Sequence, residues 1–64
     1  MIKNKVSLTE SISHARHPNT PVETLSVLAT DENWSVRFCV ARHPNTSVED
    51  LKVLATDKNW NVRY

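Results

Sequence analysis

The chain has 64 residues, a formal net charge of +1 and 39% apolar residues. A chain of this length forms one small domain with a marginal core, and its balanced charge gives no support to nucleic-acid binding on bulk charge alone. It contains no glycine and one cysteine. The lack of glycine excludes phosphate-binding loops and nucleophile elbows, and the single cysteine excludes an intrachain disulfide.

The sequence predicts neither a secretory signal nor a membrane helix. Residues 1–12 lack the apolar segment of a signal peptide. The longest apolar run covers four residues, Phe38 to Ala41, whereas a membrane helix needs roughly 20. Together with the single thiol, these features indicate a cytoplasmic protein in a reducing compartment.

An internal repeat dominates the sequence. Residues 17–38 and 43–64 are identical at 16 of 22 positions, with a spacing of 26. A fixed period of this size is typical of stacked helical units, that is, of an α-solenoid. We therefore predict one all-α domain over residues 1–64, with a capping helix in 1–16, a first repeat in 17–42 and a truncated second repeat in 43–64.

The first predicted helix spans residues 8–16. Ser7 and Glu10 fit a capping box at its start. Its apolar face would hold Leu8, Ile12 and Ala15, and the other face would hold Glu10, Ser13 and His14. A helix with one apolar and one polar face suits the end of an array, where one side meets a neighbour and the other meets water.

Each repeat begins with a predicted helix, at 21–30 and at 47–56. A threonine and a glutamate three residues apart form a candidate capping box before each one: the pairs are Thr20 with Glu23 and Thr46 with Glu49. Pro21 would take the first helical position, where its missing N–H costs nothing. The apolar stripe of the first of these helices would consist of Val22, Leu25, Leu28 and Ala29. Val27 lies off this stripe and is expected to pack against the next repeat.

The second helix of the first repeat is predicted at 33–42, and its counterpart in the second repeat as a short segment at 59–64. Asp31 or Asn33 can cap the longer of the two. That helix is apolar on two sides, with Trp34, Phe38 and Ala41 on one and Val36, Cys39 and Val40 on the other. We therefore expect it to be buried between neighbouring helices.

The pattern HPNTP-V-E-x-L-x-x-LA-x-D followed by W-x-VR recurs almost unchanged and resembles the leucine-rich repeat variant family, and more loosely HEAT-type helical repeats. The resemblance covers residues 8–64. It implies a right-handed α-solenoid that serves as a binding scaffold rather than as a catalyst. Some members of that family hold an iron–sulfur cluster with an N-terminal group of cysteines, but no cysteine precedes Cys39 here, so we expect no cofactor.

Metal binding and catalysis find little support in the sequence. The residues His14, His17, Cys39 and His43 have ligand types and spacings that zinc accepts. However, His17 and His43 occupy the same turn position in the two repeats, and Cys39 belongs to an apolar face. We expect the histidines to lie at helix C-termini, where a partial positive charge suits the dipole, and Cys39 to be a packing residue rather than a nucleophile. No metal site and no enzymatic activity are predicted.

Four arginines recur as two pairs, Arg16 with Arg42 and Arg37 with Arg63. The resemblance to HEAT-type arrays implies that Arg37 and Arg63 pair with the acidic residue of the preceding loop, which is Asp31 for the first and Asp57 for the second. The other two arginines end their helices, where cations suit the dipole. Alternatively, all four could follow a phosphate backbone at one-repeat spacing, which would make the chain a nucleic-acid binder.

Trp34 and Trp60 are expected to form a ladder at one-repeat spacing. Leu8 takes the same position in the first helix, which favours core packing for both indoles. Binding to a partner and stacking on nucleic-acid bases are the alternatives, because exposed tryptophans often anchor interfaces.

We interpret the chain as a non-catalytic module that binds another macromolecule, foremost a protein, as an adaptor or an inhibitor. The second repeat lacks a counterpart of residues 39–42, so an apolar edge near Val53, Trp60 and Tyr64 is expected to stay open, with Trp34 as a further candidate for the partner surface. A two-fold contact needs a single surface used twice. This predicts a homodimer joined through the C-terminal ends.

Overall fold

The computed structural model describes residues 8–63, and for Leu8 and Thr9 it describes the backbone alone. Within that range the chain forms five helices and no strand, which confirms the all-α prediction: α1 (Leu8–Arg16), α2 (Val22–Leu28), α3 (Trp34–Ala41), α4 (Val48–Leu54) and α5 (Trp60–Arg63). All five lie where they were predicted. Four of them are shorter than expected by one to two residues at their ends.

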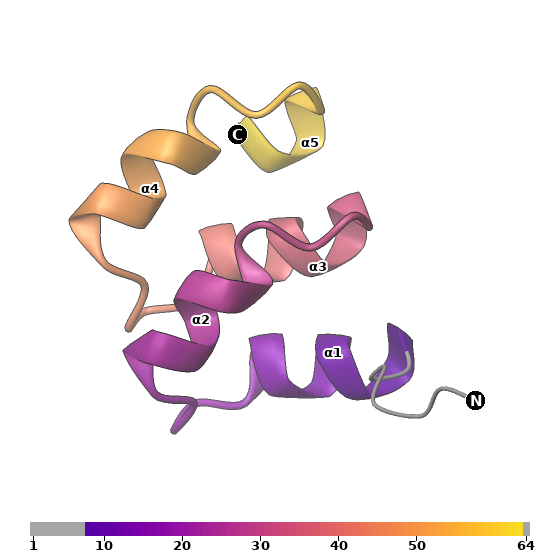
Figure 1. Cartoon of the computed structure of the whole chain (residues 1–64), viewed down its shortest axis with the longest axis vertical. Helices are drawn as coiled ribbons and strands as arrows, with labels where there is room; N and C mark the ends of the chain where they lie inside the picture. Colours follow the sequence, from indigo (N-terminus) through magenta and orange to yellow (C-terminus); the bar gives the residue numbers. More distant parts are fainter. Residues whose placement is uncertain (1–7, 64) are drawn as a thin grey trace.

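The helices form two neighbouring groups (Figure 1). Helices α1, α3 and α5 follow one another along the long axis of the molecule, and α2 and α4 lie beside them. Helix α3 contacts each of the other four. The prediction that this helix is buried between neighbours is therefore confirmed.

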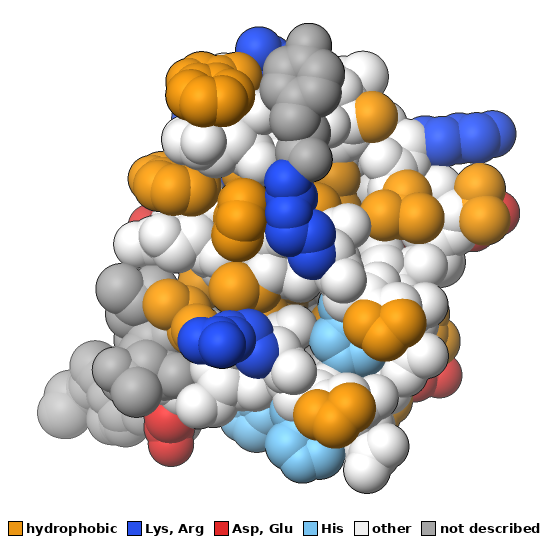
Figure 2. Space-filling view, turned by 180° about the vertical axis from the view of Figure 1, so that it is seen from behind, with side chains coloured by type: hydrophobic (Ala, Val, Ile, Leu, Met, Phe, Trp, Pro, Cys, Tyr) orange, Lys and Arg blue, Asp and Glu red, His pale blue; other side chains and the backbone are white. Residues whose placement is uncertain are grey.

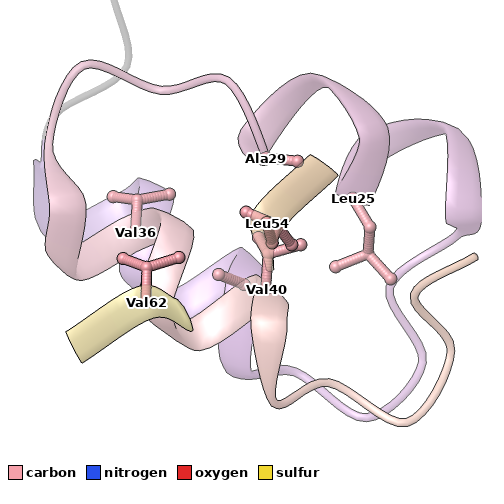
Figure 3. Close-up of a cluster of buried hydrophobic side chains, with 7 residues drawn as sticks. Leu25, Ala29, Val36, Val40, Leu54 and Val62 are labelled. Atoms are coloured by element: carbon pink, nitrogen blue, oxygen red, sulfur yellow. The ribbon is translucent and has the colours of Figure 1, made fainter. Parts of the chain in front are cut away.

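The core of the described part of the chain is one cluster of buried apolar side chains: Ala15, Leu25, Ala29, Val36, Val40, Leu54 and Val62. Figure 3 shows the two valines of α3 between side chains of the preceding and the following helices. Ala15 is fully buried, whereas Ser13 and His14 are exposed, so α1 has the two contrasting faces that its sequence predicts.

Helices α2 and α4 begin one residue later than predicted. Pro21 is the N-cap of α2, with φ −65° and ψ 152°, and it offers no side-chain hydrogen bond. Ser47 is the N-cap of α4, and its hydroxyl accepts the Asp50 N–H at 3.1 Å. The capping boxes predicted at Thr20 and Thr46 are therefore wrong.

The two threonines instead close the preceding helices. Thr20 Oγ1 donates to the carbonyl of His14 at 2.5 Å, and Thr46 Oγ1 donates to that of Val40 at 2.6 Å. The same kind of bond ends α2 and α4, from Thr30 to Val27 at 3.0 Å and from Thr56 to Val53 at 2.8 Å. No residue in the described range has a positive φ. Threonine hydroxyls thus satisfy C-terminal carbonyls that a left-handed glycine satisfies in many other helices.

An aspartate and an asparagine build the turn before α3. Asn33 Oδ1 accepts the Ser35 N–H at 2.8 Å, so of the two predicted caps Asn33 is the one that serves. Asp31 Oδ1 accepts the Asn33 N–H at 2.8 Å. The same two bonds precede α5, from Asn61 to Asn59 at 2.8 Å and from Asn59 to Asp57 at 2.9 Å. Both copies of the motif therefore enter these helices through the same side-chain turn.

Candidate interaction surface

A nearly buried ion pair joins the two copies of the motif. Arg37 Nε lies 2.7 Å from Asp57 Oδ2, Nη2 donates to Oδ1 at 3.2 Å, and the side chains are 10% and 11% exposed. Arg37 Nη1 donates to the backbone carbonyls of Asp31 and Glu32, at 2.7 and 3.1 Å. The predicted pairing of Arg37 with the Asp31 carboxylate is therefore wrong, because its acidic partner comes from the following copy. Arg63 likewise bonds the Asp57 backbone carbonyl, at 2.6 Å, and not its carboxylate.

The ion pair perturbs the titration of its acid. The hydrogen bond from Arg37 holds the pKa of the Asp57 carboxyl below its ordinary value of 3.8; burial acts in the opposite direction, and the Asn59 N–H lowers it further. A lowered pKa means that the fold favours the charged carboxylate. At neutral pH the pair therefore stabilises the packing of the second copy on the first.

The turns of the two copies are also bonded to each other. His43 Nδ1 accepts the Asn45 N–H at 3.0 Å, so the neutral ring carries its proton on Nε2 and donates it to the carbonyl of His17, at 2.5 Å. The Asn45 amide donates to the Pro18 carbonyl at 3.1 Å. The turn of the first copy thus presents carbonyls that the second copy uses.

The four arginines of the nucleic-acid alternative are in different environments. Arg37 is buried in its ion pair. Arg63 is exposed, with one nitrogen bound to a backbone carbonyl. Arg42 is exposed, and its guanidinium lies 4.2 Å from the ring centroid of Phe38. Arg16 is exposed at the end of α1.

Both tryptophans lie at the surface. Trp34 is 40% exposed and Trp60 is 62% exposed. Trp34 makes an edge contact with Phe38, with ring centroids 6.1 Å apart and planes at 85°. The expectation of core packing is wrong for both, because each is the first residue of its helix and lies at the edge of the packed region.

Equivalent positions of the two copies differ in burial, and the difference locates an open surface. Leu25 is fully buried and Leu51 is 40% exposed. The same increase occurs at three further positions, from Val22 (39%) to Val48 (63%), from Ala29 (6%) to the exposed Ala55, and from Trp34 (40%) to Trp60 (62%). We call the second-copy side chains Val48, Leu51, Ala55 and Trp60 the end face. Figure 2 shows apolar side chains at the surface over α4 and α5, with Lys and Arg side chains among them.

Val53 was predicted to belong to this open edge. It is 61% exposed, but its counterpart Val27 is 71% exposed. The exposure of Val53 is therefore common to both copies and does not mark the end of the packed region. Because Val27 is 71% exposed, the predicted packing of Val27 against the next repeat is wrong. The further predicted residue, Tyr64, lies outside the described residues.

A pocket of about 180 Å³ opens in the end face. Its lining comes from α3, α4, α5 and the C-cap residues of α3 and α4: Ala41, Arg42, Leu51, Leu54, Ala55, Val62 and Arg63. The positions 26 residues earlier include Ala15, Leu25, Ala29 and Val36, all of which belong to the core. The pocket was not predicted from the sequence.

The predicted histidine and cysteine candidates are not brought together. His14 and His17 are exposed, His43 is buried and Cys39 is half-buried. The part of the chain that the structure describes holds no group of three or more metal-binding side chains. In the same residues, no helix has the length and apolar character needed to cross a membrane.

No family model, curated protein or solved structure matches this chain. The resemblance to the leucine-rich repeat variant family therefore stays a prediction.

Proposed function

We propose that the chain is a non-catalytic protein-binding module of the cytoplasm, built as a short right-handed α-solenoid of the leucine-rich repeat variant type, with the end face as its contact surface. The observation that carries the proposal is the exposure of Leu51, whose first-copy counterpart Leu25 is fully buried. A contiguous exposed apolar surface is costly in water and marks interaction sites in soluble proteins.

In the absence of another partner, a second copy of the chain covers the end face. A two-fold contact requires one surface used twice. Among the described residues, the exposed side of α1 carries the polar side chains Ser13 and His14, so a head-to-tail stack would set the apolar end face against a polar helix side. A domain of this size also gains a large part of its stability from covering such a surface.

Sedimentation equilibrium with a matched pair of variants tests this proposal. Leu51→Asp places a charge on the end face, and Val27→Asp places the same charge on a surface valine outside it. The wild type and Val27→Asp should be dimers at high micromolar concentration, and Leu51→Asp should be a monomer. Tyr64→Asp should also split the dimer. A wild type that stays monomeric, or a dimer that survives Leu51→Asp, would contradict the proposal.

Nucleic-acid binding is the second candidate, and the arginine environments support it less. Arg37 is held by the Asp57 carboxylate, so it has no free guanidinium to offer a phosphate. Arg16, Arg42 and Arg63 are exposed. Contacts from so few cations give weak binding that salt removes easily.

A further inference from the structure

The contact between the two copies shows what kind of group the end face can receive. Arg37 binds two backbone carbonyls through Nη1 and the Asp57 carboxylate through Nε and Nη2. Arg63 is the counterpart of Arg37, and its Nη1 binds the carbonyl of Asp57 in the same manner. Among the residues that the structure describes, no carboxylate reaches Arg63. Its guanidinium is thus oriented by the same loop contact but lacks the bidentate acidic partner that arginine prefers.

The two copies also differ in their apolar contacts at the pocket. In the first copy, Val40 is fully buried in the cluster that contains Ala15, Leu25 and Val36. In the second copy, the residues equivalent to those around Val40 are present, but the pocket between them is open. In the first copy, the group in the equivalent place is an aliphatic side chain on a helix, Val40.

A second copy of this chain cannot supply both groups in a head-to-tail arrangement. Asp31 is the counterpart of Asp57, and no arginine reaches its carboxylate within the described residues. However, α1 packs on α3 as α3 packs on α5. If Asp31 of a second copy paired with Arg63 as Asp57 pairs with Arg37, α3 of that copy would pack on α5. The α1 helix of that copy would then have to occupy the place that α5 already fills. A head-to-tail copy of this chain therefore cannot supply the carboxylate that Arg63 lacks.

We propose that the end face binds a helical segment of a partner protein that supplies an aspartate carboxylate to Arg63 and an aliphatic side chain to the pocket. The inference rests on the proposed function and names the chemistry of its partner. The internal template is residues 39–64 of the chain itself, in which the aliphatic Val40 is fully buried in the core and Asp57 accepts the hydrogen bond from Arg37. The partner segment displaces the second copy of the chain from the end face.

A synthetic peptide with the sequence of residues 39–64, carrying Cys39→Ser to prevent oxidation, is the probe. Within the intact chain these residues cover the first-copy equivalent of the end face. Calorimetric titration of the peptide into the full chain should give saturable binding. Asp57→Asn in the peptide, or Arg63→Gln in the chain, should weaken it about tenfold or more, because hydrogen bonds between charged groups are lost. Arg16→Gln in the chain is the matched control and should change nothing.

A second measurement covers the case in which the free peptide is too unstructured to bind. Joining the same residues after Tyr64 raises their effective concentration to about the millimolar range. The joined chain should melt at a higher temperature than the wild type, and both Arg63→Gln and the asparagine substitution in the added segment should remove most of that gain.

The possible failures are distinguishable. A joined chain that melts no higher than the wild type overturns the inference, and so does peptide binding that Arg63→Gln leaves unchanged. If the dimer is nevertheless split by Leu51→Asp, the proposed function stands and the partner chemistry is wrong.

Discussion

Arg37 and Arg63 occupy the same position of the motif, yet they make different contacts. The first is buried and bridges the copies, and the second is exposed. Asp31 and Asp57 differ in the same way, since within the described range only the carboxylate of Asp57 is bound by a guanidinium. The identity of a residue therefore does not fix its energetic role, which depends on whether the following copy is present.

Substituting the two aspartates with asparagine separates these roles. Asparagine keeps the side-chain oxygen that caps the turn and removes the charge. Asp57→Asn should lower the free energy of unfolding by about 2 kcal/mol, because a charge-assisted bond is lost, and Tm by about 10 °C. Asp31→Asn should stay within about 0.5 kcal/mol of the wild type. Thermal denaturation followed by circular dichroism measures both, and equal losses would contradict the assignment of the ion pair.

The stability that Asp57→Asn removes should depend on pH. The pKa of Asp57 is lower in the folded state than its ordinary value of 3.8. Its contribution to stability is therefore complete above that value and is lost as the pH falls through the folded-state pKa. The difference in Tm between the wild type and Asp57→Asn should be constant down to about pH 5 and close at lower pH. A gap that persists in strong acid would show that the charge is not its cause.

Thr46 tests the role of hydroxyls at helix ends. Its side chain is buried and donates to the Val40 carbonyl at 2.6 Å. Thr46→Val preserves the shape and removes the donor, which should cost about 1 kcal/mol. The matched variant Thr56→Val removes an exposed hydroxyl that makes the same bond, and should cost less than about 0.5 kcal/mol. Urea denaturation measures the two values, and the account fails here if the exposed site costs as much as the buried one.

At the scale of elements, the sequence predicts which helices exist better than where they begin. The period of the motif places all five, and the two apolar sides of α3 predict its burial. The error at α2 and α4 arises because a threonine hydroxyl can either cap the helix that follows or close the helix that precedes. In the structure Thr20 and Thr46 do the second, and Ser47 takes the cap of α4.

Equivalent leucines of α2 and α4 should differ in their contribution to stability. Leu25 is fully buried and Leu51 is 40% exposed. Leu25→Ala should lower the free energy of unfolding by about 3 kcal/mol, because it leaves a cavity. Leu51→Ala should cost less than about 1 kcal/mol at concentrations low enough to keep the chain monomeric. Chemical denaturation of the two variants measures this, and a similar loss at both positions would mean that the end face is covered within one chain.

At the scale of the whole molecule, the sequence left two places open for Trp60, core packing and an open edge near the C-terminal end. Trp60 is exposed, which rules out the first. Leu51 and the pocket were not predicted, because the apolar stripe of α4 repeats that of α2 and the sequence alone does not say which stripe is covered. The bridge between Arg37 and Asp57 was missed because it joins residues 20 apart, across the two copies.

We propose that the end face, and not another surface, is where this molecule meets its partners. Amide chemical shifts recorded by NMR during dilution of the wild type test this residue by residue. We expect the shifts to change along α4 and α5, from Val48 to Arg63, while those of α1 stay constant. Changes centred on α1, or spectra and a diffusion coefficient that do not depend on concentration, would contradict it.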